Sequence, residues 1–276
     1  MAESTPVGDE LDGGTYPLTD AGQRLEWADG DGESFDALSK WFNETRAYAL
    51  LVQREGNRWE ARWHSFIEPE VEAEKLTELA RLLGSFLDHS RAALNYSVYQ
   101  LALYAISQDP SLGDRINPES IEFPIFDDPK RFRQKNKVRK LPQQHREAIE
   151  SVQPYDGRNP GLWVLHELAR EYRHRVVHPA AILPGEGVTH VLVNGQLVLT
   201  PDLEVIPHER LKHDDVLMRF SLPAVEPEAD VKPQYAIAVS IDHPLTRGLI
   251  GTSVLNQIRK DTEAALAVVV ALFAGG

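Results

Sequence analysis

The chain has 276 residues, a net charge of −13 and no cysteine. This length allows one large domain or two smaller ones, and without cysteine neither a disulfide nor a thiolate metal site can form. The N-terminus lacks the basic and apolar pattern of a secretory signal, and the longest apolar run, residues 264–274, is too short to span a bilayer. We therefore expect a soluble, cytoplasmic protein that does not enter a membrane.

Acidic residues concentrate near the N-terminus. Residues 1–36 hold ten acids and one base, so this segment carries −9 of the total −13 and leaves about −4 for the rest of the chain. This composition predicts a disordered acidic tail over residues 1–33. An acidic protein is normally repelled by nucleic acid, but the charge of this body is much closer to neutral.

Residues 34–69 predict a short helix followed by a β-hairpin. Ser34 is suited to cap a helix in "SFDALSKWFNE". The two strand-like runs that follow are joined at Glu55-Gly56-Asn57, and Pro69 ends the second run.

Helical patterns dominate residues 70–180. Apolar side chains recur at three- and four-residue steps along 70–106: Leu76, Leu79, Leu83, Phe86, Leu94, Val98, Leu101 and Ala105. A proline-punctuated connection, predicted as a long loop over 107–142, leads to a short helix that Pro154 closes. A second long helical segment, 162–178, ends at Pro179.

The second half of the predicted loop is strongly basic. Its cations are Lys130, Arg131, Arg133, Lys135, Lys137, Arg139 and Lys140. Such a run is most often a solvated loop, and composition favours that interpretation; the alternative is an arm that contacts phosphates.

Residues 181–245 predict a β region. Apolar alternation on both sides of Asn194-Gly195 indicates a hairpin, and "DDVLMRFSL" and "QYAIAVSI" indicate two further strands. Residues 246–276 predict a C-terminal helix that packs on the core. The fold class expected from this order of elements is α+β.

The helical segment 162–178 combines an apolar face with a basic one. Its apolar face holds Leu162, Leu165, Leu168, Tyr172 and Val176, and the opposite stripe holds His166, Arg170, His174 and His178, with Arg173 at its margin. Imidazoles beside guanidinium groups can support acid–base chemistry, but the stripe is also compatible with a solvated helix face or with pairing to Asp88 and Glu167.

A metal site is not expected on this stripe. His174 and His178 have the spacing of ligands on a metal-binding helix, but the chain lacks an HExxH pattern and the neighbouring arginines repel a cation.

The run Arg173-His174-Arg175-Val176-Val177-His178 resembles the motif of the HEPN superfamily of helical bundles, in which an Arg, often with a polar residue after it, precedes a His by a few residues. A longer resemblance involves four segments: "LGSFLDHSRAALNYSVYQLA" (83–102), "FPIFDDPKRF" (123–132), "IESVQPYDG" (149–157) and "LWVLHELAREYRHR" (162–175). They are similar, in the same order, to the LRSALDH, FPI, QPY and DKHR landmarks of a family of uncharacterised bacterial proteins.

The resemblance implies a HEPN-like antiparallel helical bundle core (70–180), with an N-terminal β-hairpin, a C-terminal β region and a final helix. It also implies a homodimer and a metal-independent endoribonuclease without a cofactor, in which a 2′-hydroxyl attacks the adjacent phosphate. His178 would act as base or acid, Arg173 would stabilise the phosphorane charge, and Asn95 would orient Arg173. Further candidates for binding the RNA substrate are Arg91, Arg170, His174, Arg175, Lys130, Arg131 and Arg133.

Two other functions remain open at the level of sequence. The first is a non-catalytic homodimeric module in which the Arg/His stripe makes structural hydrogen bonds. The second is a small-molecule site lined by Trp59, Trp63 and Trp163. Exposed and convergent Arg173 and His178 side chains would favour the ribonuclease, whereas carboxylate-paired ones would favour the structural module.

Overall fold

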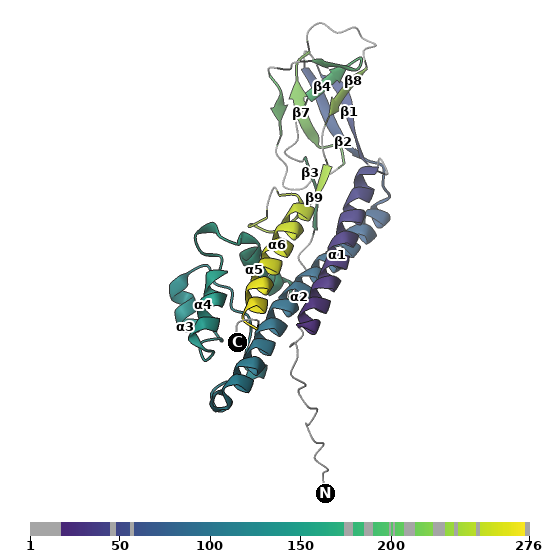
Figure 1. Cartoon of the computed structure of the whole chain (residues 1–276). Coiled ribbons are helices and arrows are strands. Elements are labelled where there is room, and N and C mark those ends of the chain that lie inside the picture. Colours follow the sequence, from purple (N-terminus) through teal and green to yellow (C-terminus); the bar gives the residue numbers. More distant parts are fainter. Residues whose placement is uncertain are drawn as a thin grey trace.

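The computed structural model describes residues 18–44, 48–55, 58–173, 179–184, 190–198, 200, 202–206, 213–222, 230–234, 237–246 and 249–273. Helices and antiparallel strands occupy separate parts of the molecule, which confirms the α+β class. The strands gather at one end of a bundle of helices (Figure 1). The helices and the short 3-10 turns between them are here called the helical body, and the strands the β region.

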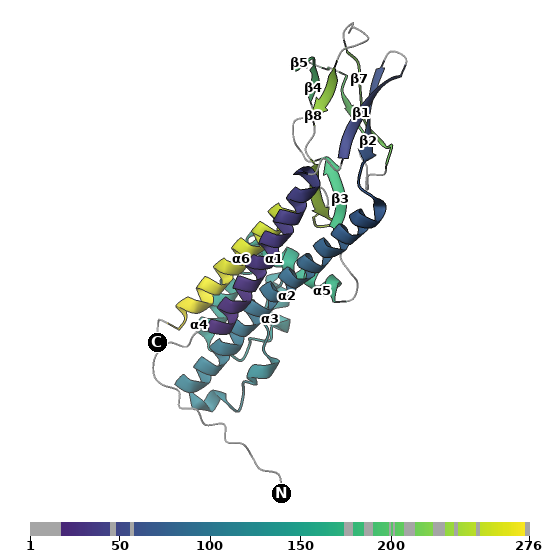
Figure 2. The ribbon, with the colours of Figure 1, turned by 90° about the vertical axis from the view of Figure 1, so that its right-hand side faces the viewer.

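The helical body consists of α1 (Thr19–Glu44), α2 (Pro69–Gln108), α3 (Pro129–Lys135), α4 (Gln143–Ser151), α5 (Pro160–Tyr172) and α6 (Gly251–Ala271). Three 3-10 turns, Pro110–Leu112, Pro118–Ser120 and Tyr155–Gly157, lie between these helices. The two longest helices, α1 and α2, run antiparallel side by side, and α5 and α6 pack against them (Figure 1 and Figure 2).

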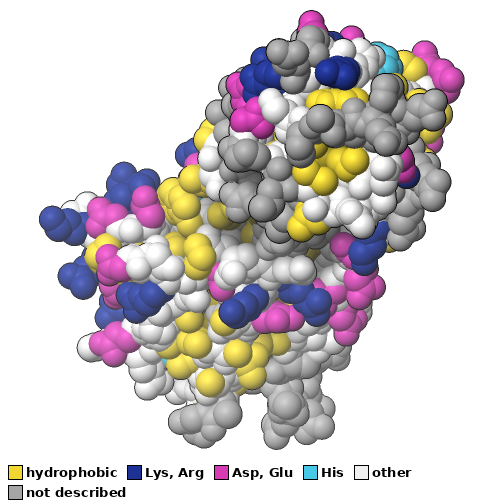
Figure 3. Space-filling view, turned by 90° about the horizontal axis from the view of Figure 1, so that it is seen from above, with side chains coloured by type: hydrophobic (Ala, Val, Ile, Leu, Met, Phe, Trp, Pro, Cys, Tyr) yellow, Lys and Arg dark blue, Asp and Glu magenta, His cyan; other side chains and the backbone are white. Residues whose placement is uncertain are grey.

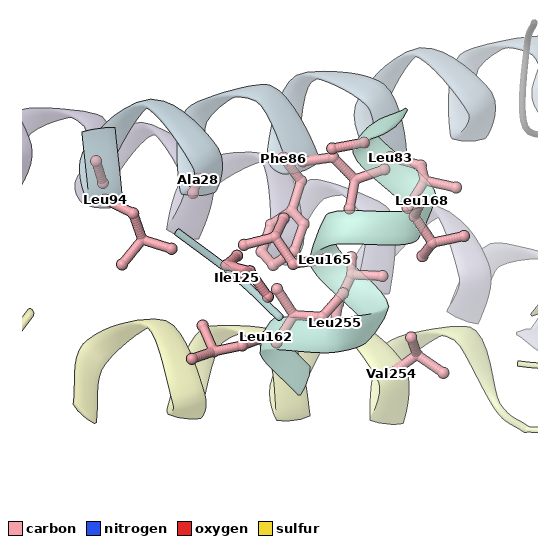
Figure 4. Packing of buried hydrophobic residues seen from close by; sticks show 14 of the residues in the cluster. Ala28, Leu83, Phe86, Leu94, Ile125, Leu162, Leu165, Leu168, Val254 and Leu255 are labelled. Atoms are coloured by element: carbon pink, nitrogen blue, oxygen red, sulfur yellow. The ribbon is translucent and has the colours of Figure 1, made fainter. Parts of the chain in front are cut away.

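One apolar core joins these helices. Figure 4 shows Leu83, Phe86 and Leu94 of α2 meeting Leu162, Leu165 and Leu168 of α5, with Ala28 of α1, Ile125, and Val254 and Leu255 of α6 around them. All of these side chains are buried. The predicted apolar face of segment 162–178 is therefore confirmed for the residues of α5.

Two glycines set the position of α5. A Cβ at Gly161 would lie 2.4 Å from the backbone oxygen of Gln257, so α5 begins in close contact with α6. The Gly161 N–H donates to Oδ2 of Asp261 at 2.6 Å, so a carboxylate of α6 satisfies a free amide in the first turn of α5. At the other end, a Cβ at Gly84 would overlap the ring of Tyr172, which holds the last turn of α5 against α2.

The described strands of the β region form three antiparallel sheets. The four-stranded sheet has the order β1 (Tyr48–Glu55), β2 (Arg58–Ser65), β7 (Val216–Phe220) and β6 (Glu204–Val205). The three-stranded sheet has the order β5 (Gln196–Val198), β4 (His190–Val193) and β8 (Val231–Gln234). The third pairs β3 (Pro179–Pro184) with β9 (Ile237–Ile241), which lie between the helical body and the other strands (Figure 1 and Figure 2).

Several sequence predictions are confirmed by this arrangement. The hairpin of β1 and β2 pairs Glu55 with Arg58, and β4 and β5 pair across Asn194-Gly195, whose φ angles of 50° and 77° fit the predicted tight turn. The long helix over 70–106, the short helix before Pro154 and the C-terminal helix are also present.

The predicted acidic tail over 1–33 and the Ser34 cap are wrong where the structure describes them. Residue 19 already begins α1, and Ser34 lies inside that helix with its Oγ donating to the oxygen of Gly30 at 2.8 Å. Every seventh residue of α1 is buried: Ala21, Ala28, Phe35 and Phe42. Packing of this stripe against the rest of the helical body outweighs the low helix propensity of the glycines. Residues 1–17 lie outside the described residues.

The predicted loop over 107–142 also contains regular structure. Asp128 caps α3 by accepting from the Lys130 N–H at 2.7 Å, and Pro129 occupies the first turn. Helix α5 ends at Tyr172, and residues 174–178 of the predicted helical segment lie outside the described residues.

Candidate functional site

The extended segment 123–126, from the sequence "FPIF", is held by polar side chains that enter the helical body from α2. The Phe123 N–H donates to Oδ1 of Asn95 at 3.0 Å, and Nη2 of Arg91 donates to the Phe123 oxygen at 2.7 Å. The described interaction of the Asn95 oxygen is therefore with the backbone of Phe123 and not with Arg173, the residue that Asn95 was predicted to orient.

A glutamine holds the other end of this segment. The Nε2 of Gln153 donates to the Pro124 oxygen at 2.8 Å, and Oε1 of Gln153 accepts from the Phe126 N–H at 3.0 Å. Gln153 is fully buried and belongs to the "QPY" turn after α4. Hydrogen bonds thus join three of the four sequence segments that carry the resemblance.

Arg91 has an unusual environment for a buried cation. Its side chain is 9% exposed, and its Nη2 group donates to the neutral oxygen of Phe123. The second terminal nitrogen, Nη1, is buried and has no hydrogen-bond partner among the described residues. No carboxylate of the described residues lies within 4.0 Å of the Arg91 side-chain nitrogens. Burial lowers the pKa of Arg91 to about 10; the charge of Glu122 opposes this shift and that of Arg173 adds to it. Arg91 therefore stays a cation at neutral pH without a bound counter-charge.

His166 of α5 lies in the field of the same group of arginines. Burial, followed by the charges of Arg91, Arg170, Arg131 and Arg173, lowers the pKa of His166 to about 4. The imidazole is therefore neutral at pH 7 and can accept a hydrogen bond from a ligand. Trp163 stacks beside it, with 5.6 Å between ring centroids. We call Arg91, His166, Arg131, Arg170 and Arg173 the arginine cluster.

Two carboxylates lie next to the arginine cluster. Glu122 pairs with Lys137, with 2.8 Å between Oε1 and Nζ. The hydrogen bond from Lys137 holds the pKa of Glu122 below its usual value, and the charges of Arg91 and Arg173 act in the same direction. Glu167 pairs with Arg170 of its own helix at 2.5 Å. Arg170 of α5 is thus paired with a carboxylate, as expected for a non-catalytic module in which the Arg/His stripe makes structural bonds.

Arg173 is exposed at the C-terminal end of α5, and its side chain has no ion pair among the described residues. The contact between Tyr172 and Gly84 places the last turn of α5 beside α2, about two helical turns before Arg91, and the charge of Arg173 acts on Arg91 from there. His174, Arg175 and His178 lie outside the described residues, so the convergence of Arg173 with His178 stays a prediction.

The three predicted RNA contacts on α3 are distributed around its exposed surface. Arg131 pairs with Asp127 at 3.1 Å, and Arg133 approaches Glu150 at 3.5 Å. Lys130 is exposed and makes no ion pair within the described chain. Of these three, Arg131 is the one whose charge acts on His166.

The tryptophans proposed to line a small-molecule site do not form one group. Trp63 is buried and stacks on Tyr48, with 4.6 Å between ring centroids. Trp59 belongs to the same strand, whereas Trp163 lies on α5 beside His166.

His166 belongs to the basic stripe predicted from the sequence but was not among the predicted site residues, and Glu122 was not predicted at all. The spacing between His166, Arg170 and Arg173 carried a signal, because residues three, four and seven apart share a helix face. Glu122 had no such signal. Within the described part of the chain, no three His, Asp or Glu side chains come together in a way that could hold a metal ion.

Comparison of the chain with protein-family models, curated proteins and solved structures finds no match. The HEPN resemblance therefore stays a prediction. No described helix has the length and apolar character needed to cross a membrane.

Proposed function

We propose that this protein binds single-stranded RNA through a phosphate at the arginine cluster and cleaves it as a metal-independent endoribonuclease of HEPN type. The observation that carries the proposal is the Nη1 group of Arg91, a buried guanidinium donor without a partner among the described residues. A phosphate oxygen supplies both the missing acceptor and the missing negative charge.

The other members of the arginine cluster suit the same ligand. Arg173 has an exposed guanidinium whose charge acts on Arg91, so it adds to the positive potential that attracts a phosphate to this site. Neutral His166 suits a hydrogen bond from a ribose hydroxyl. The field of several cations offsets the repulsion expected from the acidic chain as a whole.

The reaction needs two proton transfers and no metal. The ribose 2′-oxygen bonds to phosphorus, its proton passes to a base, the bond from phosphorus to the 5′-oxygen breaks, and an acid protonates that oxygen. Arg173 stabilises the charge on the phosphorane, and His178 acts as base or acid. The products are a 2′,3′-cyclic phosphate and a 5′-hydroxyl.

Binding is tested by fluorescence anisotropy of a labelled single-stranded RNA at fixed salt. Arg173→Ala should weaken binding at least about tenfold, because a charge-assisted hydrogen bond contributes about 1.5–3 kcal/mol. Arg81→Ala is the matched control, since Arg81 is an exposed arginine of α2 about ten residues from Arg91. Equal weakening by the two substitutions would show nonspecific attraction and would contradict the proposal.

Cleavage is tested in EDTA with wild type and His178→Ala, after both are shown to elute at the same size. Wild type should cleave and leave cyclic phosphate ends, and a 2′-deoxy nucleotide at the cleaved position should block the reaction while leaving binding intact. Wild-type protein that binds RNA without cleaving any of several RNAs would reduce the proposal to RNA binding.

A second function has its own supporting observation. Arg91, Asn95 and Gln153 all bond to the backbone of segment 123–126, and Arg170 pairs with Glu167. Because these bonds use the polar groups of the site within the chain itself, they favour a non-catalytic module, for which the resemblance implies a homodimer. Loss of the dimer in Arg173→Ala, without measurable RNA binding by wild type, would support it.

A further inference from the structure

A second basic site lies outside the arginine cluster, in a hollow between residues 116–122 and residues 135–140. The hollow has a volume of about 450 Å³, and its charged and amide side chains are Lys135, Lys137, Arg139, Lys140, Asn117, Asn136 and Glu122. We call it the basic basin. Its volume lies within the range of small-ligand sites.

The basic basin has an excess of positive charge. Glu122 is its one carboxylate and already pairs with Lys137 at 2.8 Å. Lys135, Arg139 and Lys140 are exposed, and none of them has a carboxylate partner among the described residues. Figure 3 shows Lys and Arg side chains, with some Asp and Glu among them, on the side of the helical body where α3 and α4 lie in Figure 1. Three unpaired cations around one hollow suit a ligand with several negative charges.

Asn136 adds a different requirement. Its side chain is 6% exposed, and its Nδ2 donates to the Phe132 oxygen at 2.6 Å, which fixes the orientation of the amide. The Oδ1 atom is buried and receives no hydrogen bond from the described residues. An amide oxygen accepts from a donor, and a fully ionised phosphate chain has none, so a ligand that also carries an N–H or O–H group suits this atom better.

The walls of the basic basin are partly apolar. Ile116 and Ile121 line it beside the polar groups. A ligand that combines a chain of phosphates with a ribose and a flat base meets all three requirements: charge for the cations, a donor for Asn136 and an apolar face for the isoleucines.

We propose that the basic basin binds a nucleoside triphosphate, with the phosphates at Lys135, Arg139 and Lys140 and the nucleoside at Asn136 and the isoleucines. This site adjoins the arginine cluster at Glu122 but shares none of its residues, and the proposal does not depend on RNA binding or cleavage there.

The proposal is tested by calorimetric titration of the full chain with ATP, GTP and inorganic triphosphate, each at the same salt concentration. At least one nucleotide should bind, and inorganic triphosphate should bind at least tenfold more weakly, since it offers nothing to Asn136. Triphosphate that binds as tightly as the nucleotides would overturn the nucleoside part of the proposal. Absence of nucleotide binding would overturn all of it.

The site is located with two matched double variants. Lys135→Ala/Arg139→Ala should weaken nucleotide binding at least tenfold, because both side chains are exposed and their removal leaves the fold intact. Arg81→Ala/Lys260→Ala removes the same charges from exposed positions elsewhere and should leave the affinity unchanged. Circular dichroism checks that all proteins are folded. Equal loss in the two double variants would overturn the assignment.

Arg173→Ala separates this proposal from the proposed function. It should weaken RNA binding and leave nucleotide binding unchanged. Loss of both would place the nucleotide at the arginine cluster and overturn the basic basin as its site.

Discussion

Glu60 in the four-stranded sheet and Arg91 in the helical body are both buried charges, but their partners differ. Glu60 is 4% exposed and accepts from Arg219 at 2.8 Å and from Arg62 at 2.5 Å. The hydrogen bond from Arg219 is the first cause that holds the pKa of Glu60 below its ordinary value. Arg91 has the neutral oxygen of Phe123 and an unpartnered Nη1 among the described residues.

The difference separates a charge whose partners lie within the fold from one whose partners among the described residues are incomplete. A buried charge with close opposite charges is satisfied within the chain, and removal of either side leaves the other unpaired. A buried charge without such a partner contributes little to stability, so its retention needs another reason. In this protein we assign that reason to an anionic ligand.

The largest expected effect is that of Glu60→Gln. This substitution keeps the shape but removes the charge that two arginines share, so the free energy of unfolding at pH 7 should fall by about 2 kcal/mol. Urea denaturation followed by circular dichroism measures the change. The pKa of Glu60 is lower in the folded protein than in the unfolded chain, where it is 4.5. Ionised Glu60 therefore contributes its full stabilisation above pH 4.5, and this stabilisation is lost as the pH falls through the pKa of the folded protein.

Glu204→Gln is the control for this prediction. Glu204 lies on the neighbouring strand β6 and pairs with Arg58 at 3.5 Å, with both side chains about half exposed. Its loss should cost less than about 0.5 kcal/mol. If both variants lost a similar free energy of unfolding, burial of Glu60 would not strengthen its ion pairs.

Arg91→Met should have a smaller effect on stability and a larger one on binding. Methionine fills a similar volume, and the substitution removes a desolvated cation together with its hydrogen bond to Phe123. Because these two effects largely offset each other, the free energy of unfolding should fall by about 1 kcal/mol or less. RNA affinity should fall at least about tenfold, as for Arg173→Ala. If Arg91→Met destabilised the protein more than Glu60→Gln, the contrast between the two buried charges would be wrong.

The smallest expected effect is a pH dependence through His166. Its pKa is about 4 in the folded protein and 6.5 in the unfolded chain, so the unfolded state binds more protons between these values. The free energy of unfolding should therefore fall as pH drops below 6.5 and stay constant above it. With the side chain one-third exposed, we expect less than about 1 kcal/mol between pH 7 and pH 5.

His166→Gln is the comparison variant, measured by urea denaturation at the two pH values. It should lose less stability than wild type over this range, which lies above the ordinary glutamate pKa of 4.5 and so keeps Glu60 and Glu122 ionised. Equal losses would show that burial and the neighbouring arginines do not keep His166 neutral, and would remove His166 as a hydrogen-bond acceptor for a ribose hydroxyl.

Local patterns in the sequence were sufficient for much of the fold. The three- and four-residue spacing of apolar residues identified α2 and α5, and Asn194-Gly195 identified a hairpin, because these signals depend on neighbours in the chain. The same approach failed for α1. Its acids and glycines resemble a disordered segment, whereas the seven-residue spacing of Ala21, Ala28, Phe35 and Phe42 becomes stabilising only through packing within the helical body.

The candidate site divides in the same way. The sequence by itself determined that Arg173 and His166 share a helix with a basic side, because both lie within the helical repeat or at its end. Only the tertiary structure decided that Arg91 lies near them, since this depends on Tyr172 packing over Gly84 and on segment 123–126 bonding to α2. Helical periodicity is a property of a few consecutive residues, whereas burial of a charge without a partner depends on every element packed around it.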